Sequence, residues 1–202
     1  MEIVEADPVT GKKTPLVAMA RRALRALNKA EIPYAVIGAT ALGVRGLPRF
    51  TADLDIVVVE EDAFAALDAL DGAGFAVVTD VDRDEPPEAM YVMRQGKGEV
   101  DVLVASAEPE STVVAEAPRA RVFGVEAPVA SLEHLVLMYL YSNQLRHLGD
   151  LARIVVETTA DLASVERYLA DVHPEMLSVL RDRVQAARHP PAAPPRPPRR
   201  RR

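Results

Sequence analysis

The chain has 202 residues, of which 49% are apolar and 27% are charged, so we expect a folded domain with a buried core. It contains no cysteine, which excludes a disulfide scaffold, a cysteine-based zinc site and a thiol nucleophile. The net charge is −6, but six of the 24 basic residues are arginines beyond position 187, so residues 1–187 carry 18 basic and 30 acidic residues. Such an acidic body argues against broad binding to nucleic acid and is compatible with a protein that holds divalent cations.

The first half of the chain alternates between helical and strand patterns. In the first segment, apolar residues recur at the spacing of a helix, and the most apolar segment, DLDIVVV, has the β-branched composition of a buried strand. Glycine and proline separate the segments. We expect helices at 15–30, 38–46 and 61–70, strands at 34–37, 53–59, 75–79, 90–94 and 99–104, and an acidic loop at 81–88.

The pattern becomes helical after Ser131, which is placed to cap a helix. A short edge hairpin at 122–123 and 127–129 precedes this region. The order of elements predicts an α+β fold, in which a mixed β-sheet with flanking helices carries a C-terminal helical region. Further helices are expected at 132–143, 149–158, 162–170 and 174–187.

We divide the chain into four parts by composition. These are a flexible N-terminus (1–14), an α/β core (15–130), a helical region (131–188) and a disordered tail rich in proline and arginine (189–202). No apolar segment is long enough to cross a membrane. The first residues also lack the pattern of a secretory signal, in which an apolar run follows a basic start. We therefore expect a cytoplasmic protein with no membrane attachment.

Two carboxylates stand at the start of the most apolar strand. Asp53 and Asp55 are two residues apart, so their side chains point to the same face of the strand. Two ionised carboxylates at one strand end repel each other unless a cation lies between them. Mg²⁺ prefers oxygen ligands and shares them with phosphates. Such pairs are common, however, and the pair alone is more typical of a solvated strand end than of a metal site.

A third acid changes that balance. Asp101 lies between Val100 and Val102 in a second apolar strand, which is an unusual place for a free carboxylate. If the two strands are neighbours, three carboxylates would converge and could hold two cations, the arrangement of metal-assisted phosphoryl transfer. Two alternatives stay open at this stage: Asp101 faces solvent on an edge strand, or Glu99, on the same face, takes its role.

The segment between the first two strands carries a glycine and two polar residues that suit phosphate binding. Gly38 allows close approach of the backbone to a phosphate, and it precedes a short helix, whose N-terminus favours anions. Thr40 adds a hydroxyl donor. Arg49 would contact a phosphate or form a surface ion pair. The glycine spacing matches neither a P-loop nor a dinucleotide-binding fingerprint.

Together these residues form one pattern, which is Ile37-Gly38-Ala39, then Ala41, then Gly46-Leu47-Pro48-Arg49-Phe50-Thr51-Ala52-Asp53-Leu54-Asp55. The pattern resembles that of the nucleotidyltransferase superfamily with the DNA polymerase β-like core, and it is similar to the AbiE toxin-type and minimal nucleotidyltransferases. Asp101 corresponds to the third acid of that family. The family's helical motifs correspond to Ser131–Leu135 and Arg146–Ile154, so the resemblance spans about residues 16–158.

The resemblance implies transfer of a nucleoside monophosphate from ATP or GTP to a hydroxyl of RNA (a tRNA end, for instance), protein or a small molecule. Its cofactor would be Mg²⁺ or Mn²⁺, and a toxin–antitoxin system, with a partner protein, is one context. By the resemblance, Asp53, Asp55 and Asp101 are catalytic and hold the metal. The nucleotide-binding residues implied are Gly38, Ala39, Thr40, Arg49 and Thr51.

The sequence also departs from the family pattern. Two lysines of the family appear here as Tyr139 and Gly149, and Ala39 stands where the family has glycine or serine. Fewer basic residues would then bind the triphosphate, unless an arginine reaches it from elsewhere. The arginines that could do so are Arg45, Arg49, Arg146 and Arg153. The alternative interpretation is a catalytically weak or inactive module of the same fold that acts as a partner protein.

Overall fold

The computed structural model describes residues 16–106, 108–142, 144–157 and 162–189. The predictions of a flexible segment at 1–14 and of a disordered tail concern residues outside these ranges, apart from His189. The division into a core and a helical region stays a prediction. Among the helices of the described ranges, none combines the length and the apolar run that crossing a membrane requires.

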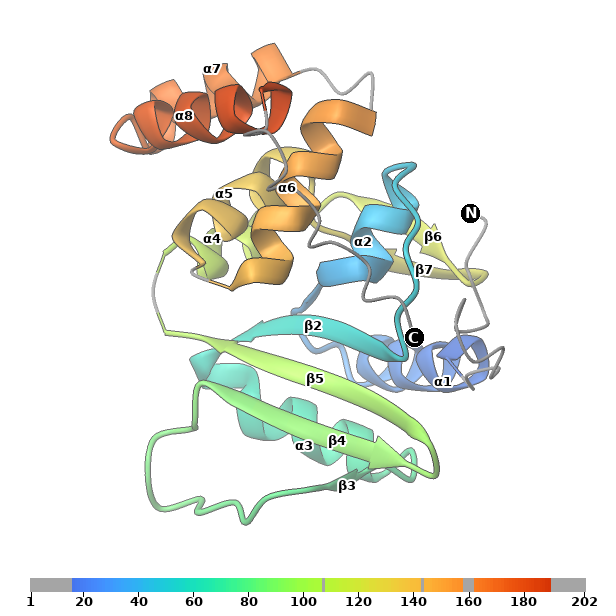
Figure 1. The fold of residues 1–202 in the computed structure, drawn as a ribbon. Coiled ribbons are helices and arrows are strands. Elements are labelled where there is room, and N and C mark those ends of the chain that lie inside the picture. The colour runs from blue at the N-terminus through green and yellow to red at the C-terminus, as the bar shows by residue number, and fades with distance from the viewer. Residues whose placement is uncertain (1–15, 107, 143, 158–161, 190–202) are drawn as a thin grey trace, which may run out of the picture.

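A five-stranded sheet forms the centre of the fold (Figure 1). Its strands follow the order β1-β2-β5-β4-β3, and β2 pairs with β5 in parallel while the other neighbours are antiparallel. The sheet is therefore mixed, as expected from the sequence. The strands are β1 (Ala35–Val36), β2 (Asp53–Val59), β3 (Ala76–Val77), β4 (Met90–Gln95) and β5 (Gly98–Ala105).

Two helices, α1 (Leu16–Lys29) and α3 (Ala63–Asp71), pack against one face of the sheet (Figure 1). The apolar residues of α1 recur every three or four positions and are almost completely buried, because this spacing places them on one side of a helix. In β2 the alternate residues Leu54, Ile56 and Val58 are buried too. The apolar periodicity of the sequence thus builds the core that holds the sheet.

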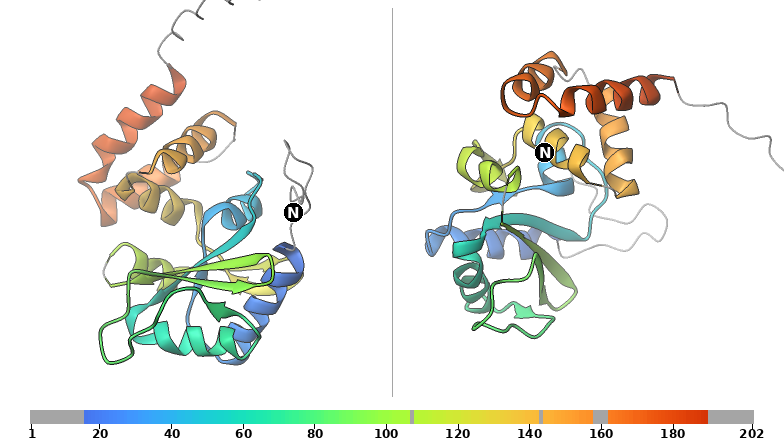
Figure 2. Two further views of the ribbon diagram at one scale, coloured as in Figure 1. Left: turned by 60° about the horizontal axis from the view of Figure 1, so that its bottom comes forward. Right: turned by 90° about the vertical axis from the view of Figure 1, so that its left-hand side faces the viewer.

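The remaining helices lie at the other side of β2, and α7 and α8 are the farthest from the sheet (Figures 1 and 2). They are α2 (Gly38–Val44), α4 (Glu110–Glu116), α5 (Leu132–Tyr141), α6 (Leu145–Glu157), α7 (Leu162–Val172) and α8 (Met176–Arg188). A single 3-10 turn (Glu60–Asp62) precedes α3. Ser131 caps α5 as expected, since its hydroxyl accepts a hydrogen bond from the backbone N–H of His134 (3.1 Å).

Two expectations on the elements need correction, and one helix was not predicted. The helix expected at 149–158 begins earlier, at Leu145. The expected edge hairpin is a separate two-stranded sheet of β6 (Arg119–Val122) and β7 (Val125–Pro128), with its turn at 123–124. Helix α4 had no sequence prediction, because its seven residues include a threonine and two valines, whose helix propensity is low.

Arg45 joins the end of α2 to the segment that leads into α5. Its guanidinium donates hydrogen bonds to the carbonyl oxygens of Val129 (2.9 Å) and Ala130 (2.9 and 3.1 Å). Val129 and Ala130 are fully buried, so these carbonyls depend on Arg45 for partners. Arg45 therefore acts in the packing of the fold.

Replacing Arg45 by leucine should lower the free energy of unfolding by about 1–3 kcal/mol, because buried carbonyl groups lose their donor. Urea unfolding measures this change. The matched control is Arg121→Leu, which breaks only the exposed ion pair with Glu126 and should change stability by less than about 0.5 kcal/mol. Equal effects of the two substitutions would contradict a structural role of Arg45.

Candidate active site

The register of the two parallel strands brings the three acidic residues together. Asp55 of β2 lies directly opposite Asp101 of β5, and Asp53 lies opposite Glu99. Asp53, Asp55 and Asp101 each offer a carboxylate oxygen, and these oxygens all lie within 4.8 Å of one another. The side chains of both strands alternate between faces, so the three carboxylates occupy the same face of the sheet.

The side-chain positions distinguish Asp101 from Glu99. Glu99 accepts hydrogen bonds from the guanidinium of Arg94, at 2.5 and 3.0 Å, and is held at the β4 side of the strand. Asp101 instead joins the acidic cluster. Thr51, which comes just before β2, donates a hydrogen bond from its hydroxyl to Asp53 and thereby fixes that carboxylate.

The backbone of Gly38 lies directly against the carboxylate of Asp55. Its φ is +60°, a conformation that favours glycine, and a Cβ built on it would lie only 2.0 Å from Oδ2 of Asp55. The preceding residue, Ile37, donates its backbone N–H to the carbonyl oxygen of Asp55 (3.0 Å). A side chain at position 38 would therefore displace the carboxylate, which gives a physical reason for glycine at this point of the motif.

Burial and neighbouring carboxylates raise the pKa of two of the three acids, Asp55 and Asp101. Burial, with the charges of Asp53 and Asp101, raises the pKa of Asp55 to about 7, although Arg146 and Arg49 oppose this change. Burial, then Asp53 and Glu99, raises the pKa of Asp101, and Arg146 again opposes it. The site is therefore short of positive charge for the number of carboxylates that it holds.

The cluster fits a divalent cation. One carboxylate oxygen of Asp101, Oδ1, is buried and has no hydrogen-bond partner among the described residues, which is costly for a carboxylate. Three carboxylates within reach of one another, with an oxygen left unpaired, form the all-oxygen donor set that Mg²⁺ and Mn²⁺ prefer. A cation placed there would relieve both the repulsion and the unpaired oxygen.

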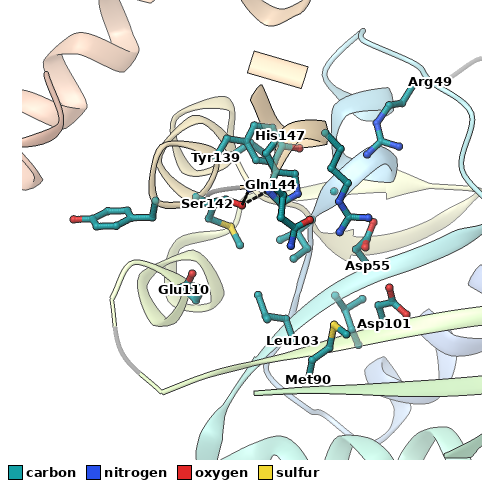
Figure 3. A pocket seen from close by; sticks show the side chains of 17 residues that line it. Arg49, Asp55, Met90, Asp101, Leu103, Glu110, Tyr139, Ser142, Gln144 and His147 are labelled. Carbon is teal, nitrogen blue, oxygen red and sulfur yellow. Dashed lines mark hydrogen bonds between the residues drawn. The ribbon is translucent and has the colours of Figure 1, made fainter. Parts of the chain in front are cut away.

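A cleft of about 300 Å³ lies between this face of the sheet, at β2 and β5, and helices α5 and α6. In Figure 3, Asp55 and Asp101 lie at the sheet side of the cleft, and Tyr139 and His147 lie together at the helical side. Asp53 belongs to the cluster but is not part of the cleft wall. The wall is formed by Ile37, Gly38, Arg49, Asp55, Ile56, Met90, Asp101, Leu103, Glu110, Leu135, Met138, Tyr139, Tyr141, Ser142, Gln144, Arg146 and His147.

The five predicted nucleotide-binding residues divide into two groups. Gly38 and Arg49 line the cleft. Ala39, Thr40 and Thr51 are buried behind it and are not part of its wall. The hydroxyl of Thr40 has no hydrogen-bond partner among the described residues. The nucleotide-binding role of all five residues stays a prediction.

Arg49 has a buried acidic partner that the sequence did not reveal. Its Nε lies 3.1 and 3.2 Å from the two carboxylate oxygens of Asp150 in α6, and the side chain of Asp150 is only 6% exposed. The ion pair connects the segment before β2 to the helical region. Arg153, a neighbour of Asp150 in the sequence, pairs with Glu157 (2.9 Å) and donates to the carbonyl oxygen of Pro48 (3.3 Å), so it is occupied outside the cleft.

Of the four arginines considered as substitutes for the missing lysines, Arg49 and Arg146 therefore reach the cleft. Sequence reasoning did not single out the stacked pair of Tyr139 and His147, although both belong to the helical motifs. Their ring centroids lie 4.8 Å apart at an interplanar angle of 26°. The signal in the sequence was the tyrosine in place of a lysine, and it did not reveal the histidine partner.

The comparison with protein-family models finds no match, and the comparison with curated proteins finds no relative. Among solved structures, the chain resembles TM1012 of Thermotoga maritima, described as a candidate nucleotidyltransferase, with 18% identity and a TM-score of 0.53 over 70% of this chain and 93% of that one. The antibiotic-resistance factor ANT(2'')-Ia, solved with adenylyl-2''-tobramycin, matches at 19% identity and a TM-score of 0.48 over 84% and 97%. At such identities the first likeness concerns the fold, and it confirms the expected nucleotidyltransferase-like fold.

Gly38→Ala should destabilise the protein by at least about 2 kcal/mol more than Gly96→Ala. Both glycines have a φ of +60°, but nothing lies within 4 Å of a Cβ at Gly96, whereas a Cβ at Gly38 collides with Asp55. The second substitution thus measures the backbone cost alone. Urea unfolding of both variants makes the comparison, and equal losses of stability would contradict the close approach of Gly38 to Asp55.

Asp55→Asn should stabilise the metal-free protein at pH 8 by about 1–3 kcal/mol. The pKa of Asp55 rises from 3.8 to about 7 on folding, so this carboxyl favours the folded state most below pH 4 and loses that advantage as the pH rises through 7. The gain from asparagine should therefore shrink at pH 5. Urea unfolding with a chelator at both pH values measures it.

The control for this substitution is Asp182→Asn, which changes an exposed acid of α8 and should alter stability by less than about 0.5 kcal/mol. A loss of stability in Asp55→Asn at pH 8 would show that the carboxylate is not under repulsion in the folded protein.

Proposed function

We propose that this chain, which has the nucleotidyltransferase fold, transfers a nucleoside monophosphate from a nucleoside triphosphate to an acceptor hydroxyl and releases pyrophosphate. The observation that carries the proposal is the convergence of Asp53, Asp55 and Asp101, whose oxygens lie within 4.8 Å of one another beside a cleft. In this reaction the acceptor oxygen forms a bond to the α-phosphorus, and the bond from that phosphorus to the β-phosphate oxygen breaks. Such transfer depends on positioning and electrostatics more than on covalent chemistry.

Asp53, Asp55 and Asp101 would hold Mg²⁺ or Mn²⁺. When bound, divalent cations in such sites neutralise charge on the phosphates and increase the reactivity of the attacking hydroxyl. Asp101 has the additional role of accepting the proton of the acceptor hydroxyl. Its buried Oδ1, which has no hydrogen-bond partner among the described residues, supports that role, because a base must have a free oxygen.

The cations of the cleft wall complete the site for a triphosphate. Arg49 and Arg146 supply positive charge opposite the acids, and Gly38 lets the backbone approach a phosphate closely. Asp150 keeps Arg49 in place through the buried ion pair. Thr51 acts indirectly, since it orients Asp53, and Ala39 and Thr40 form the turn behind the phosphates.

The nucleotide would be ATP or GTP, and the acceptor would be a hydroxyl of RNA, protein or a small molecule. The cleft wall also carries Met90, Leu103, Met138 and Tyr141, an apolar surface suited to the non-phosphate parts of either substrate.

We also propose that the protein acts in the cytoplasm within a toxin–antitoxin system, together with a partner protein. Comparing cell growth on expression of the parent protein and of an Asp53→Asn variant would test this role.

One observation favours the alternative of a weakly active module. Arg49 is already neutralised by Asp150, and the two positions that carry lysines in the family hold Tyr139 and Gly149. Each charge-assisted hydrogen bond that the triphosphate lacks weakens its binding by about 1.5–3 kcal/mol. If the protein binds nucleotide poorly and releases no pyrophosphate, its function is that of a partner protein with the same fold.

Millimolar Mn²⁺ or Mg²⁺ should raise the melting temperature, because a ligand at a hundredfold excess over its Kd stabilises the folded state by about 2.7 kcal/mol. Asp53→Asn with Asp55→Asn should abolish the shift, while the exposed Asp182→Asn should retain it. The same protein, given labelled nucleoside triphosphates and cell extract, should release pyrophosphate and label an acceptor.

The absence of any metal-dependent shift in the parent protein would count against the metal site. Metal binding and nucleotide binding without pyrophosphate release would instead favour the partner module. Pyrophosphate release that persists in the double variant would reject the assignment of the catalytic acids.

A further inference from the structure

The hydroxyl of Tyr139 is a buried polar group, and the packing of the fold gives no reason for a hydroxyl at this position. The residue is only 3% exposed, and its hydroxyl has no hydrogen-bond partner among the described residues. A buried hydroxyl without a partner destabilises the folded protein, so a phenylalanine would serve a purely structural purpose better. The side chain nevertheless forms part of the cleft wall.

The ring of Tyr139 is held in a fixed position. It stacks on His147, with centroids 4.8 Å apart, and Nδ1 of His147 lies 2.6 Å from the hydroxyl of Ser142 (Figure 3). Burial and the charge of Arg146 lower the pKa of His147, so the histidine is neutral near pH 7. The tyrosine ring therefore stacks on a neutral histidine that Ser142 holds in place, which limits its freedom to find another partner.

The charges around the hydroxyl indicate what would bind it. Asp150, Arg49, Asp55 and Arg146 are the charged groups that act on Tyr139, two anionic and two cationic. Burial raises the pKa of Tyr139, so its hydroxyl keeps its proton and is available as a donor. Among the described residues of the cleft wall, the positively charged side chains are those of Arg49 and Arg146. Anionic oxygens bound by these two arginines would lie beside the tyrosine hydroxyl.

We propose that the Tyr139 hydroxyl is a substrate contact that donates a hydrogen bond to a phosphate oxygen of the bound nucleotide. The assignment rests on the proposed function and identifies how the site compensates for a missing positive charge. A neutral donor adds no charge, but it is already fixed and desolvated before the ligand arrives. Little ordering entropy is lost on binding, and the unpaired hydroxyl gains its partner only in the complex.

The test is Tyr139→Phe, which removes one oxygen and keeps the stacked ring. Its matched control is Tyr168→Phe, because the hydroxyl of Tyr168 is also buried without a partner among the described residues. Tyr168 packs edge-on against His134, with centroids 5.6 Å apart, and is not part of the cleft wall. The two variants therefore lose the same group in the same kind of environment, one inside the site and one outside it.

Without ligand, both variants should melt at the same temperature as the parent protein or higher, since each loses an unsatisfied buried hydroxyl. Calorimetric titration with a non-hydrolysable ATP analogue and Mg²⁺ should then separate them. Tyr139→Phe should raise the Kd by about tenfold, the usual effect of losing a hydrogen bond to a charged group. Tyr168→Phe should leave the Kd unchanged. The nucleoside adenosine should bind Tyr139→Phe and the parent protein equally.

Four outcomes would overturn the assignment. An unchanged Kd in Tyr139→Phe, together with a loss of nucleotide binding in Asp55→Asn, would reject the tyrosine contact and leave the proposed function supported. A loss of ligand-free stability in Tyr139→Phe alone would show a structural role for the hydroxyl. An equal loss of affinity for adenosine would place the contact on the base or ribose. If the parent protein binds no nucleotide, the proposed function and this inference fail together.

Discussion

The mutual repulsion of carboxylates on two neighbouring parallel strands is the constraint on which the rest of the site depends. Asp55 and Asp101 occupy opposite positions in the register of β2 and β5, and Asp53 lies one step away on the same face. Burial increases this repulsion and raises the pKa of both residues. The apolar residues of the opposite faces, such as Leu54 and Val102, are completely buried and keep the strands paired despite it.

The same constraint explains why the surroundings of the cluster are so specific. At the start of α2, Gly38 lies so close to Asp55 that a side chain there would collide with the carboxylate. The hydroxyl of Thr51 donates a hydrogen bond to the carboxylate of Asp53. The pair of Arg49 and Asp150 joins the segment before β2 to α6, across the boundary between the sheet and the helices. The helical region is therefore part of the site, because it supplies one wall of the cleft and the anchor of an arginine that faces the acids.

The distribution of cations suggests how selectivity for metal and phosphate arises together. The arginines of the cleft wall lower the pKa of Asp55 without neutralising the cluster, since one of them is paired with Asp150. A divalent cation would supply the missing charge on the acidic side. On the opposite side, Tyr139 and His147 present neutral groups, so affinity for a triphosphate would depend strongly on the bound cation.

The sequence by itself determined the strands of the central sheet, the carboxylates and the glycine. The run of β-branched residues predicted β2 with its observed bounds, because such residues pack well in a buried strand. Spacing placed Asp53 and Asp55 on one face. The choice of Asp101 over Glu99, the pairing of Arg49 with Asp150, and the stack of Tyr139 on His147 were decided only by the tertiary structure. Each joins residues far apart in the chain or on separate elements, and the register and packing that bring them together leave no local pattern in the sequence.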